Sequence, residues 1–541
     1  MTKHDLPDTT RFWPFAGGDL RDIGEDGGFV EAPLAPPGPD EVIARVDAAC
    51  VCSSDIKVIR MGAAHPLFSE RDLAKEPAVL GHEMALTVVA VGENWQGRYR
   101  PGDRLGLQPA ITVAGRRHTI GMDLPGGFAQ HIRLDARTLG GDDEPYVFPV
   151  PDQVSAATIA MLEPYSCVEA AYRPNCRTGL KQGGRLLLVT GDGGDAVALD
   201  VAMPAGEVTL VAADQAAEAW TAPAKSVEQH PAVDRFLAEP EGPGFDDIIL
   251  RGRIPPEQIT ALLDRLDRGG LLVLAGAQEQ ALVTVDAARI HYHALSLLGT
   301  EGAGLADAFR PERCRFELKA GGVLLILGAG GAMGRIHLHR AVEMADGPAT
   351  ILATSRKPAR RRALEEDFGQ LARRNGKRLV ILDDADVPAT VRELAPGGCD
   401  DVVVVAPDVG LIETGAGYLA AGGMLVLFSG MPFGKPCRLP LWRIGHDGVR
   451  FTGSSGSAVA DQIAVLDRVT AGRLDLAGNL QAVGGLGALP DALEAVAEGR
   501  LSGKIAIYPG RLDLPLTPLG ELRRDGSTGW SRDDEARLAA G

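Results

Sequence analysis

Val323-Leu-Leu-Ile-Leu-Gly-Ala-Gly-Gly-Ala-Met-Gly334 joins a short apolar run to a loop with four glycines. The apolar run predicts a buried parallel strand, and the residues from Arg335 onward predict a helix. Glycines let the backbone approach a pyrophosphate, and the N-terminus of the helix offers amide groups and a positive dipole. The loop has one residue more than the plain G-x-G-x-x-G spacing, so its strand-and-helix context carries much of the prediction. The predicted dinucleotide-binding residues are Gly328, Gly330, Gly331, Met333 and Gly334.

The next predicted strand, Ala349 to Ser355, bears on the choice of cofactor. Sites that prefer NAD usually place a carboxylate at this strand end, where it grips the ribose 2′-hydroxyl. Here Ser355, Arg356 and Lys357 follow one another, and cations suit a 2′-phosphate. The sequence therefore favours NADP(H) over NAD(H). The alternative is that these cations belong to an ordinary solvated helix face.

The strand-and-glycine pattern occurs twice in the chain. Cys176-Arg-Thr-Gly-Leu-Lys-Gln-Gly-Gly184 is echoed by Cys314-Arg-Phe-Glu-Leu-Lys-Ala-Gly-Gly322, and each is followed by an apolar run. Further echoes follow in the same order, at 244–250 and 398–404, at 269–276 and 422–429, and at 298–302 and 452–456. Buried parallel strands resemble one another, but the shared lead-in argues against coincidence. We interpret the pattern as two tandem Rossmann-like units.

The loop of the first copy differs from that of the second in chemistry. It reads Gly191-Asp-Gly-Gly-Asp-Ala-Val197. Asp192 and Asp195 would repel a phosphate, and Val197, matched with Gly334, would obstruct its approach. We predict that this copy does not bind the dinucleotide and instead serves packing or oligomer contacts.

A second group of candidate residues lies near the N-terminus, in Cys50-Val-Cys-Ser-Ser-Asp55 and Gly81-His-Glu83. Thiolate, imidazole and carboxylate are the ligand types that hold a catalytic zinc with one position open. Asp55 could orient His82 from behind, and the hydroxyl of Ser54 could pass a proton. Alone, a buried cysteine or histidine is more often structural.

These motifs resemble the zinc-dependent medium-chain dehydrogenase/reductase family. Further matches are Pro101-Gly-Asp-Arg104, Gly126-Gly-Phe-Ala129 and Glu163-Pro164. The stretch from Glu163 is most similar to the branch of sorbitol dehydrogenases and L-sorbose-1-phosphate reductases. The resemblance implies a zinc-dependent oxidoreductase that transfers a hydride between NADP(H) and a secondary alcohol or ketone of a polyol, cyclitol, sugar or sugar phosphate. It also implies metal ligands Cys52, His82, Glu83 and Glu163, with Ser54 and Glu163 as catalytic residues.

The expected fold class is α/β, with a GroES-like β-rich catalytic domain and two tandem doubly wound parallel-sheet units. The predicted boundaries are 1–175 for the catalytic domain, 176–305 for the degenerate unit, 306–480 for the cofactor-binding unit, and 481–541 for a return to the catalytic domain and a tail. Residues 1–25 read as a loose arm. Because no cysteine lies between Cys52 and Cys167, we expect one zinc and no second, structural one.

Composition narrows the class of partner. The formal net charge of −17 argues against nucleic acid or an anionic membrane. Seven irregularly spaced cysteines imply no disulfide framework and favour reduced thiols in a cytoplasmic protein. The first residues lack the apolar core of a signal peptide, and no apolar stretch is long enough for a membrane helix. We expect a small-molecule substrate and a homo-oligomer, either a dimer or a tetramer.

Two other functions stay open. The chain could be a zinc-free quinone or enone reductase with a vestigial thiol and histidine, or a non-catalytic scaffold or regulatory homologue. The intact set of Cys52, His82, Glu83 and Glu163 argues against the first, and the intact second glycine loop argues against the second. The extra unit also raises a geometric question, because it stands between the catalytic domain and the unit predicted to bind the cofactor.

Overall fold

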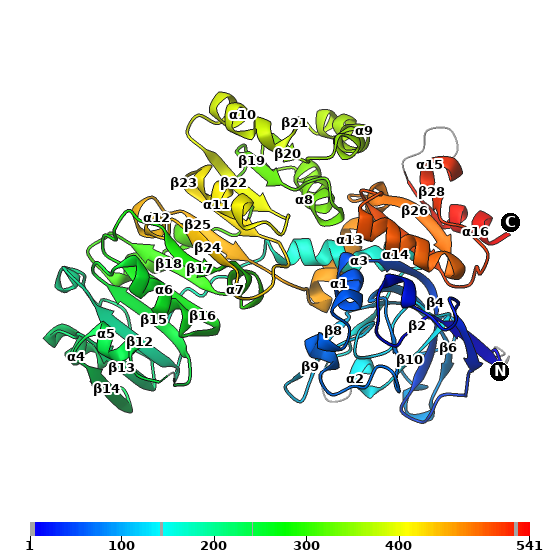
Figure 1. The fold of residues 1–541 in the computed structure, drawn as a ribbon, viewed down its shortest axis with the longest axis horizontal. Helices are drawn as coiled ribbons and strands as arrows, with labels where there is room; N and C mark the ends of the chain where they lie inside the picture. Colours follow the sequence, from blue (N-terminus) through cyan, green and yellow to red (C-terminus); the bar gives the residue numbers. More distant parts are fainter. Residues whose placement is uncertain (1–5, 141–143, 241, 524–528, 541) are drawn as a thin grey trace. The chain divides into compact units, whose positions relative to one another are not determined.

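The computed structural model describes residues 6–140, 144–240, 242–523 and 529–540 (Figure 1). The chain forms two compact units. Unit 1 comprises Met1–Glu169, Gly331–Ile336 and Gly456–Gly541, and unit 2 comprises Ala170–Gly330 and His337–Ser455. Within the described ranges, no helix combines the length and the apolar character needed to cross a membrane.

Unit 1 is built on an eight-stranded sheet. Seven strands follow the order β11-β7-β6-β4-β27-β26-β28, and β10 also pairs with β4. The strands are β4 (Val42–Val51), β6 (Glu83–Val91), β7 (Arg104–Leu107), β10 (His131–Leu134), β11 (Val147–Pro149), β26 (Leu480–Gly485), β27 (Lys504–Tyr508) and β28 (Thr517–Pro518). The helices α1 (Ser53–Met61), α3 (Ala156–Ala170) and α14 (Leu489–Glu498) complete its main framework. The predicted β-rich domain is confirmed, and late strands of the chain return to pair with early ones.

Segments near both ends of the described chain are held in unit 1. The prediction of a loose arm is wrong from residue 9, because β1 (Thr9–Phe12) pairs with β3 (Val30–Pro33). Trp13 is buried, and its indole N–H donates to the carbonyl oxygen of Leu486 at 2.8 Å. Near the other end, α16 (Arg532–Ala540) brings the carboxylate of Glu535 to the first amides of α3. Apolar burial and helix capping hold these segments in place.

Unit 2 contains two six-stranded parallel sheets (green and yellow in Figure 1), one in each copy of the repeat. The first has the order β14-β13-β12-β15-β16-β18 and the second β21-β20-β19-β22-β23-β25, so each follows the Rossmann order 3-2-1-4-5-6. The first sheet consists of β12 (Arg185–Thr190), β13 (Glu207–Val211), β14 (Ser226–His230), β15 (Phe245–Arg251), β16 (Leu266–Ala275) and β18 (Ser296–Thr300). The second consists of β19 (Val323–Leu327), β20 (Thr350–Thr354), β21 (Arg378–Leu382), β22 (Cys399–Val404), β23 (Leu419–Leu427) and β25 (Arg450–Gly453). The predicted tandem Rossmann-like units are confirmed.

The two copies contact each other through equivalent elements. β17 (Val283–Asp286) of the first copy pairs antiparallel with β24 (Pro436–Leu439) of the second. The helix after β17, α7 (Ala287–Tyr292), packs on β25, and the helix after β24, α12 (Trp442–His446), packs on β18. Equivalent elements therefore make equivalent contacts: β17 pairs with β24, and each helix packs on the last strand of the other copy's sheet. Such reciprocal contacts are those of a two-fold interface.

The structure corrects the alignment of the two glycine loops. The amide of Arg185 donates to Asp246 and that of Val323 donates to Asp400, both at 2.9 Å, so these two strands start in the same register. Counting from there, Gly328 matches Thr190, Gly330 matches Asp192 and Gly334 matches Ala196. The expected match of Gly334 with Val197 is therefore wrong by one residue. It pairs Gly328 with the first glycine of the other loop, Gly191, whereas the strand register pairs Gly328 with Thr190.

Candidate functional site

The first sequence motif places Cys52 and Ser54 at the start of a helix. β4 ends at Val51, and Cys52 is the N-cap of α1. Asp55, fully buried, accepts the amide N–H of Cys52 at 2.8 Å through Oδ2, and its Oδ1 lies 3.2 Å from Nδ1 of His82. One carboxylate thus fixes both the cysteine backbone and the histidine ring, and it leaves Nε2 of His82 facing the other way.

The second motif depends on a glycine. Gly81 has a φ of +94°, and a Cβ there would lie 2.7 Å from the ring of Phe128. This conformation favours glycine and turns the chain into His82 and then into β6, which begins at Glu83. Both side chains are buried as a result.

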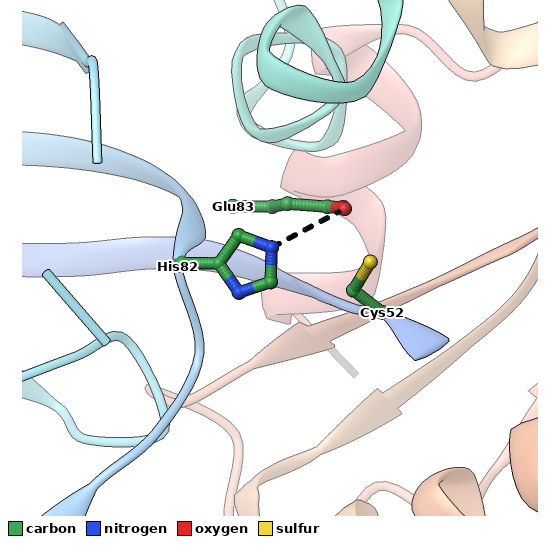
Figure 2. Close-up of side chains that lie close together, drawn as sticks. All are labelled: Cys52, His82 and Glu83. Carbon is green, nitrogen blue, oxygen red and sulfur yellow. Dashed lines mark ion pairs between the residues drawn. The ribbon is translucent and has the colours of Figure 1, made fainter. Parts of the chain in front are cut away.

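Cys52, His82 and Glu83 come together as predicted. Each offers one ligand atom, and these atoms all lie within 4.8 Å of one another (Figure 2). Nε2 of His82 lies 3.9 Å from Oε1 of Glu83, and the hydroxyl of Ser54 lies 3.3 Å from the same nitrogen. The donor set, one sulfur, one imidazole nitrogen and one carboxylate, fits zinc.

The electrostatics of this group favour a cation. Burial alone would lower the pKa of His82, but Asp55 and the sulfur of Cys52 outweigh burial and raise it well above the usual value. The ring therefore sits where positive charge is stabilised, whether that charge is a proton or a metal. A metal would have to replace the proton, so its binding would release protons.

Lys504 was not identified from the sequence. Its ammonium lies 2.5 Å from Oε1 of Glu83, and both side chains are buried. Burial alone would lower the pKa of Lys504, but Cys52 and Glu83 raise it, so the lysine stays charged. Oε2 of Glu83 is buried and has no hydrogen-bond partner within the described part of the chain. Lys504 thus holds the oxygen of Glu83 that lies beside His82.

Glu163 does not belong to the group formed by Cys52, His82 and Glu83. It lies on α3, where its Oε1 accepts a hydrogen bond from the thiol of Cys167 at 3.2 Å. Burial raises the pKa of Glu163, while His82 acts to lower it and Glu83 to raise it. The carboxyl group therefore lies in the electrostatic range of both His82 and Glu83.

Arg71 and His65, which lie between the two motifs in the sequence, have structural partners. The guanidinium of Arg71 donates to the carbonyl oxygens of Glu76, Asp123 and Pro77. Nδ1 of His65 accepts the amide of Leu67, which begins the short helix at Pro66–Phe68.

The second-copy loop follows β19 as predicted, but its helix starts earlier than expected. α8 spans Ala332–Glu343, so Met333 and Gly334 lie in the first turn of the helix. Gly328 has a φ of +92°, and a Cβ on Gly330 would lie 2.4 Å from Oγ of Ser355. Gly330 is needed for this close approach, whereas a Cβ on Gly331 would meet nothing within 4 Å.

The strand end after this loop carries the predicted cations. Ser355 is buried, and Arg356 has a side chain that is 75% exposed, with its Nε 3.9 Å from a carboxylate oxygen of Asp384. Lys357 is the N-cap of α9 (Pro358–Arg374). Arg361 is committed elsewhere, because it pairs with Asp383 at 2.5 Å and donates to the carbonyl oxygen of Ser355.

The first-copy loop has a different local structure. A single 3-10 turn, Gly194–Ala196, replaces the helix that follows the loop in the second copy. The side chain of Arg251 is buried beneath this turn, where it donates to the carbonyl oxygen of Val197 at 2.8 Å and to Asp214 at 2.6 Å. In the second copy the matching residue is Val405.

The structure also brings together Glu228, His230 and Glu239 on the first copy. Nε2 of His230 lies 3.2 Å from Glu228 and Nδ1 lies 3.2 Å from Glu239. Both carboxylates are exposed, and these ion pairs account for the cluster.

Comparison with known proteins agrees with this architecture. Residues 38–141 match the alcohol dehydrogenase GroES-like domain. This match and the relatives below agree with the predicted resemblance to the medium-chain dehydrogenase/reductase family. The chain is 27% identical over 297 residues to L-sorbose 1-phosphate reductase of Klebsiella pneumoniae, covering 50% of this chain and 71% of that protein. It is 24% identical over 271 residues to sorbitol dehydrogenase of Bacillus subtilis (strain 168), covering 46% and 71%.

Solved structures share the fold of this chain at low sequence identity. The 2R,3R-butanediol dehydrogenase of Bacillus subtilis aligns with a TM-score of 0.53 and 16% identity, covering 92% of this chain and 99% of that one. A protein assigned as a zinc-binding dehydrogenase from Sinorhizobium meliloti 1021, bound to NADP, aligns with a TM-score of 0.52 and 16% identity, covering 93% and 100%. The predicted resemblance and the predicted fold class are therefore confirmed.

Proposed function

We propose that the chain transfers a hydride between NADP(H) and a secondary alcohol or ketone of a polyol, cyclitol, sugar or sugar phosphate, with one catalytic zinc. The observation that carries the proposal is the buried group of Cys52, His82 and Glu83 in a GroES-like domain, with Asp55 behind the histidine. Relatives named for sorbitol and L-sorbose 1-phosphate support the substrate class.

Cys52, His82 and Glu83 would hold the zinc, and Glu163 would hold or exchange with its water. A bound zinc supplies a Lewis acid that polarises an alcohol or carbonyl oxygen. Lys504 holds Oε1 of Glu83, the oxygen that also lies 3.9 Å from Nε2 of His82. This ion pair fixes the carboxylate beside the proposed metal position.

Ser54 would carry the substrate proton away from the reacting oxygen. Its hydroxyl is 3.3 Å from Nε2 of His82, so it lies beside the proposed metal position. A hydroxyl can accept one proton while donating another, which is what a relay requires. Glu163, whose pKa is raised by burial, would take or give a proton near neutral pH more readily than an exposed glutamate.

The second copy would bind the cofactor, with Gly328, Gly330, Gly331, Met333 and Gly334 forming the pyrophosphate loop and the first helical turn. Residues 331–336 belong to the same compact unit as the proposed zinc ligands, and Arg335 in this stretch pairs with Asn479 of that unit at 3.1 Å. All of 176–305 belongs to unit 2. The first turn of the helix after the second copy's loop thus belongs to unit 1, whereas no part of the first copy does.

Preference for NADP(H) would come from Ser355, Arg356 and Lys357. The strand end has no carboxylate of its own, and the exposed guanidinium of Arg356 suits a 2′-phosphate. In an Arg356→Ala variant the Kd for NADPH should rise about tenfold, or about 1.4 kcal/mol, while that for NADH stays unchanged. Fluorescence titration measures both, with Arg362→Ala, an exposed arginine on the following helix α9, as the matched control. Equal losses for both cofactors would contradict the preference.

The first copy would act as a structural partner of the second. Its β17 pairs with β24, while α7 packs on β25 and α12 packs on β18. These contacts bury the surface through which the two copies face each other. A homo-oligomer would then have to use a different surface. Sedimentation of the full chain tests this, and chemical cross-links between β24 of two separate chains would contradict it.

Metal analysis tests the zinc proposal. The wild-type chain should bind one zinc, and Cys52→Ser should lose both the metal and NADPH-dependent reduction of L-sorbose 1-phosphate or fructose. Cys50→Ala is the matched control, because Cys50 is a buried cysteine two residues away on β4 and does not belong to the donor group. A Cys52→Ser variant that keeps its zinc would contradict the ligand assignment. Wild-type protein with zinc and NADPH bound but no reductase activity would favour a scaffold role.

A further inference from the structure

Cys176 and Cys314 occupy equivalent positions at the starts of the two copies, and the structure brings them together. They are 138 residues apart in the sequence, and each opens the same Cys-Arg-x-x-Leu-Lys lead-in. Both side chains pack against the same hydrophobic cluster of the first copy, and they lie close enough to interact with each other and with the guanidinium of Arg450. This contact follows from the reciprocal packing of the copies, because equivalent residues near a two-fold axis lie close to each other.

The surroundings hold both cysteines in place. Arg450, buried on the edge strand β25, donates to the carbonyl oxygen of Cys314 at 2.9 Å and to the side chain of Asn175, the residue before Cys176. The side chain of Asn175 in turn donates to Thr452 of the same strand at 3.2 Å. One guanidinium therefore ties together the two segments that carry the thiols.

These two thiols differ from the buried cysteines of the chain. Cys50, Cys167, Cys399 and Cys437 are buried, and burial raises the pKa of each thiol. Cys176 and Cys314 are only partly buried. The interaction with Cys314, together with the charge of Arg450, lowers the pKa of Cys176 to about 7, while the same interaction raises that of Cys314. Cys176 is thus the better nucleophile of the pair at neutral pH.

We infer that Cys176 and Cys314 are a dithiol–disulfide couple that reversibly links the two Rossmann-like copies, with a low-molecular-weight disulfide as oxidant. The Cys176 thiolate attacks one sulfur of the small disulfide, forms a mixed disulfide and releases one small thiol. Cys314 loses its proton and attacks the Cys176 sulfur, which forms the Cys176–Cys314 bond and releases the second small thiol. Two protein thiols are oxidised and one small disulfide is reduced to two thiols.

Thiol exchange on the zinc-loaded full-length protein tests the couple. The reduced protein is incubated with oxidised glutathione, quenched with acid and mapped by mass spectrometry without reduction. The wild type should yield a peptide pair linked through Cys176 and Cys314, and dithiothreitol should reverse the link. The rate of linkage should rise with pH through about 7, where Cys176 ionises.

Single variants separate the roles of the two thiols. Cys314→Ser should stop at a stable glutathione adduct on Cys176, because nothing resolves the mixed disulfide. Cys176→Ser should slow modification of Cys314 at least about tenfold. Cys437→Ser, which removes a buried cysteine of β24, should link as the wild type does. Oxidation should also raise the midpoint of thermal unfolding in the wild type and in Cys437→Ser only, because the bond closes a long loop of the unfolded chain.

Two results would overturn the inference. One is a wild-type map without the Cys176–Cys314 peptide at a glutathione disulfide excess that modifies Cys176 in Cys314→Ser. The other is faster modification of Cys314 than of Cys176 when each is tested in the variant that lacks its partner.

Discussion

The two Rossmann-like copies share the base of their sheets but differ in their loops. In the first copy Asp246 pairs with Lys181 at 2.5 Å and Asp247 pairs with Arg177 at 2.8 Å. The second copy repeats both pairs, Asp400 with Lys319 and Asp401 with Arg315, each at 2.6 Å. The conserved geometry lies where the chain enters the sheet, and the divergent geometry lies at the opposite end of the first strand.

The divergent end shows how a nucleotide loop can become a structural one. Asp192 stands where the second copy has Gly330, and the helix N-terminus that would attract a phosphate is reduced to one 3-10 turn. Arg251 supplies positive charge from below, but its guanidinium is bound to Asp214 and to the backbone. The first copy therefore keeps a stable sheet and loses the parts that recognise a pyrophosphate.

The largest expected effect comes from giving the second loop the residue of the first. Gly330→Asp should weaken NADPH binding at least about 100-fold, or about 2.8 kcal/mol. The new Cβ would press on Ser355, and the carboxylate would repel the phosphates. Nicotinamide fluorescence titration measures the loss.

Two controls separate charge and crowding at Gly330 from general damage. Gly397→Ala, in a turn of the same copy away from the loop, adds a methyl group in open space and should bind NADPH as the wild type does. Asp192→Gly in the first copy should leave NADPH binding unchanged. If Asp192→Gly altered the measured stoichiometry, the first copy would have to be counted as a cofactor site.

A smaller effect should follow from giving the first copy the second copy's buried residue. Arg251→Val removes a buried guanidinium and leaves Asp214 and the carbonyl oxygen of Val197 without this donor. The free energy of unfolding should fall by about 2 kcal/mol, below the range for a fully buried pair because Asp214 is partly exposed. Urea denaturation checks this, and the Kd for NADPH should not change. Lys225→Val is a matched surface control in the same copy. A loss of cofactor affinity in Arg251→Val would break the division of labour between the copies.

Local patterns were predicted from the sequence more successfully than distant partners. The apolar run before Gly328 and the Cys-Arg-x-x-Leu-Lys repeat lie in short stretches, so strand, loop and duplication could be inferred. Cys52, His82 and Glu83 could be grouped because they lie in two short motifs that are close in the sequence. His82 is 27 residues from Asp55 and 28 residues from Ser54. Lys504 lies 421 residues from Glu83, and no local pattern marks it as the partner of that carboxylate.

The errors have physical causes of the same kind. The loop alignment was wrong by one residue because it followed the glycines of the two loops. The strand register is instead marked by Asp246 and Asp400, which lie far along the chain and accept the first amide of each strand. The N-terminal segment was expected to be loose because its composition is polar and mixed. The expectation failed because the segment is held by a distant residue: the carbonyl oxygen of Leu486 accepts the indole hydrogen of Trp13. Polar composition near a chain end therefore gave no signal of a long-range anchor.

The smallest expected effect tests the shared base of the two copies. Burial alone would raise the pKa of Asp246 and of Asp400, but hydrogen bonds from Lys181 or Lys319 and from a backbone amide outweigh it and lower both values. Asp246→Asn and Asp400→Asn should each reduce the free energy of unfolding by about 1 kcal/mol at neutral pH. A lowered folded-state pKa means that this stability is present above the ordinary aspartate value of 3.8 and is lost as pH falls through the folded-state value. Urea denaturation at pH 7 and at progressively lower pH should show both gaps closing together, with Asp513→Asn as the surface control. The hydrogen bonds and ion pairs of Asp246 and Asp400 are equivalent. Unequal losses of unfolding free energy in the two variants would therefore show that other contacts hold one copy's sheet and are absent from the other.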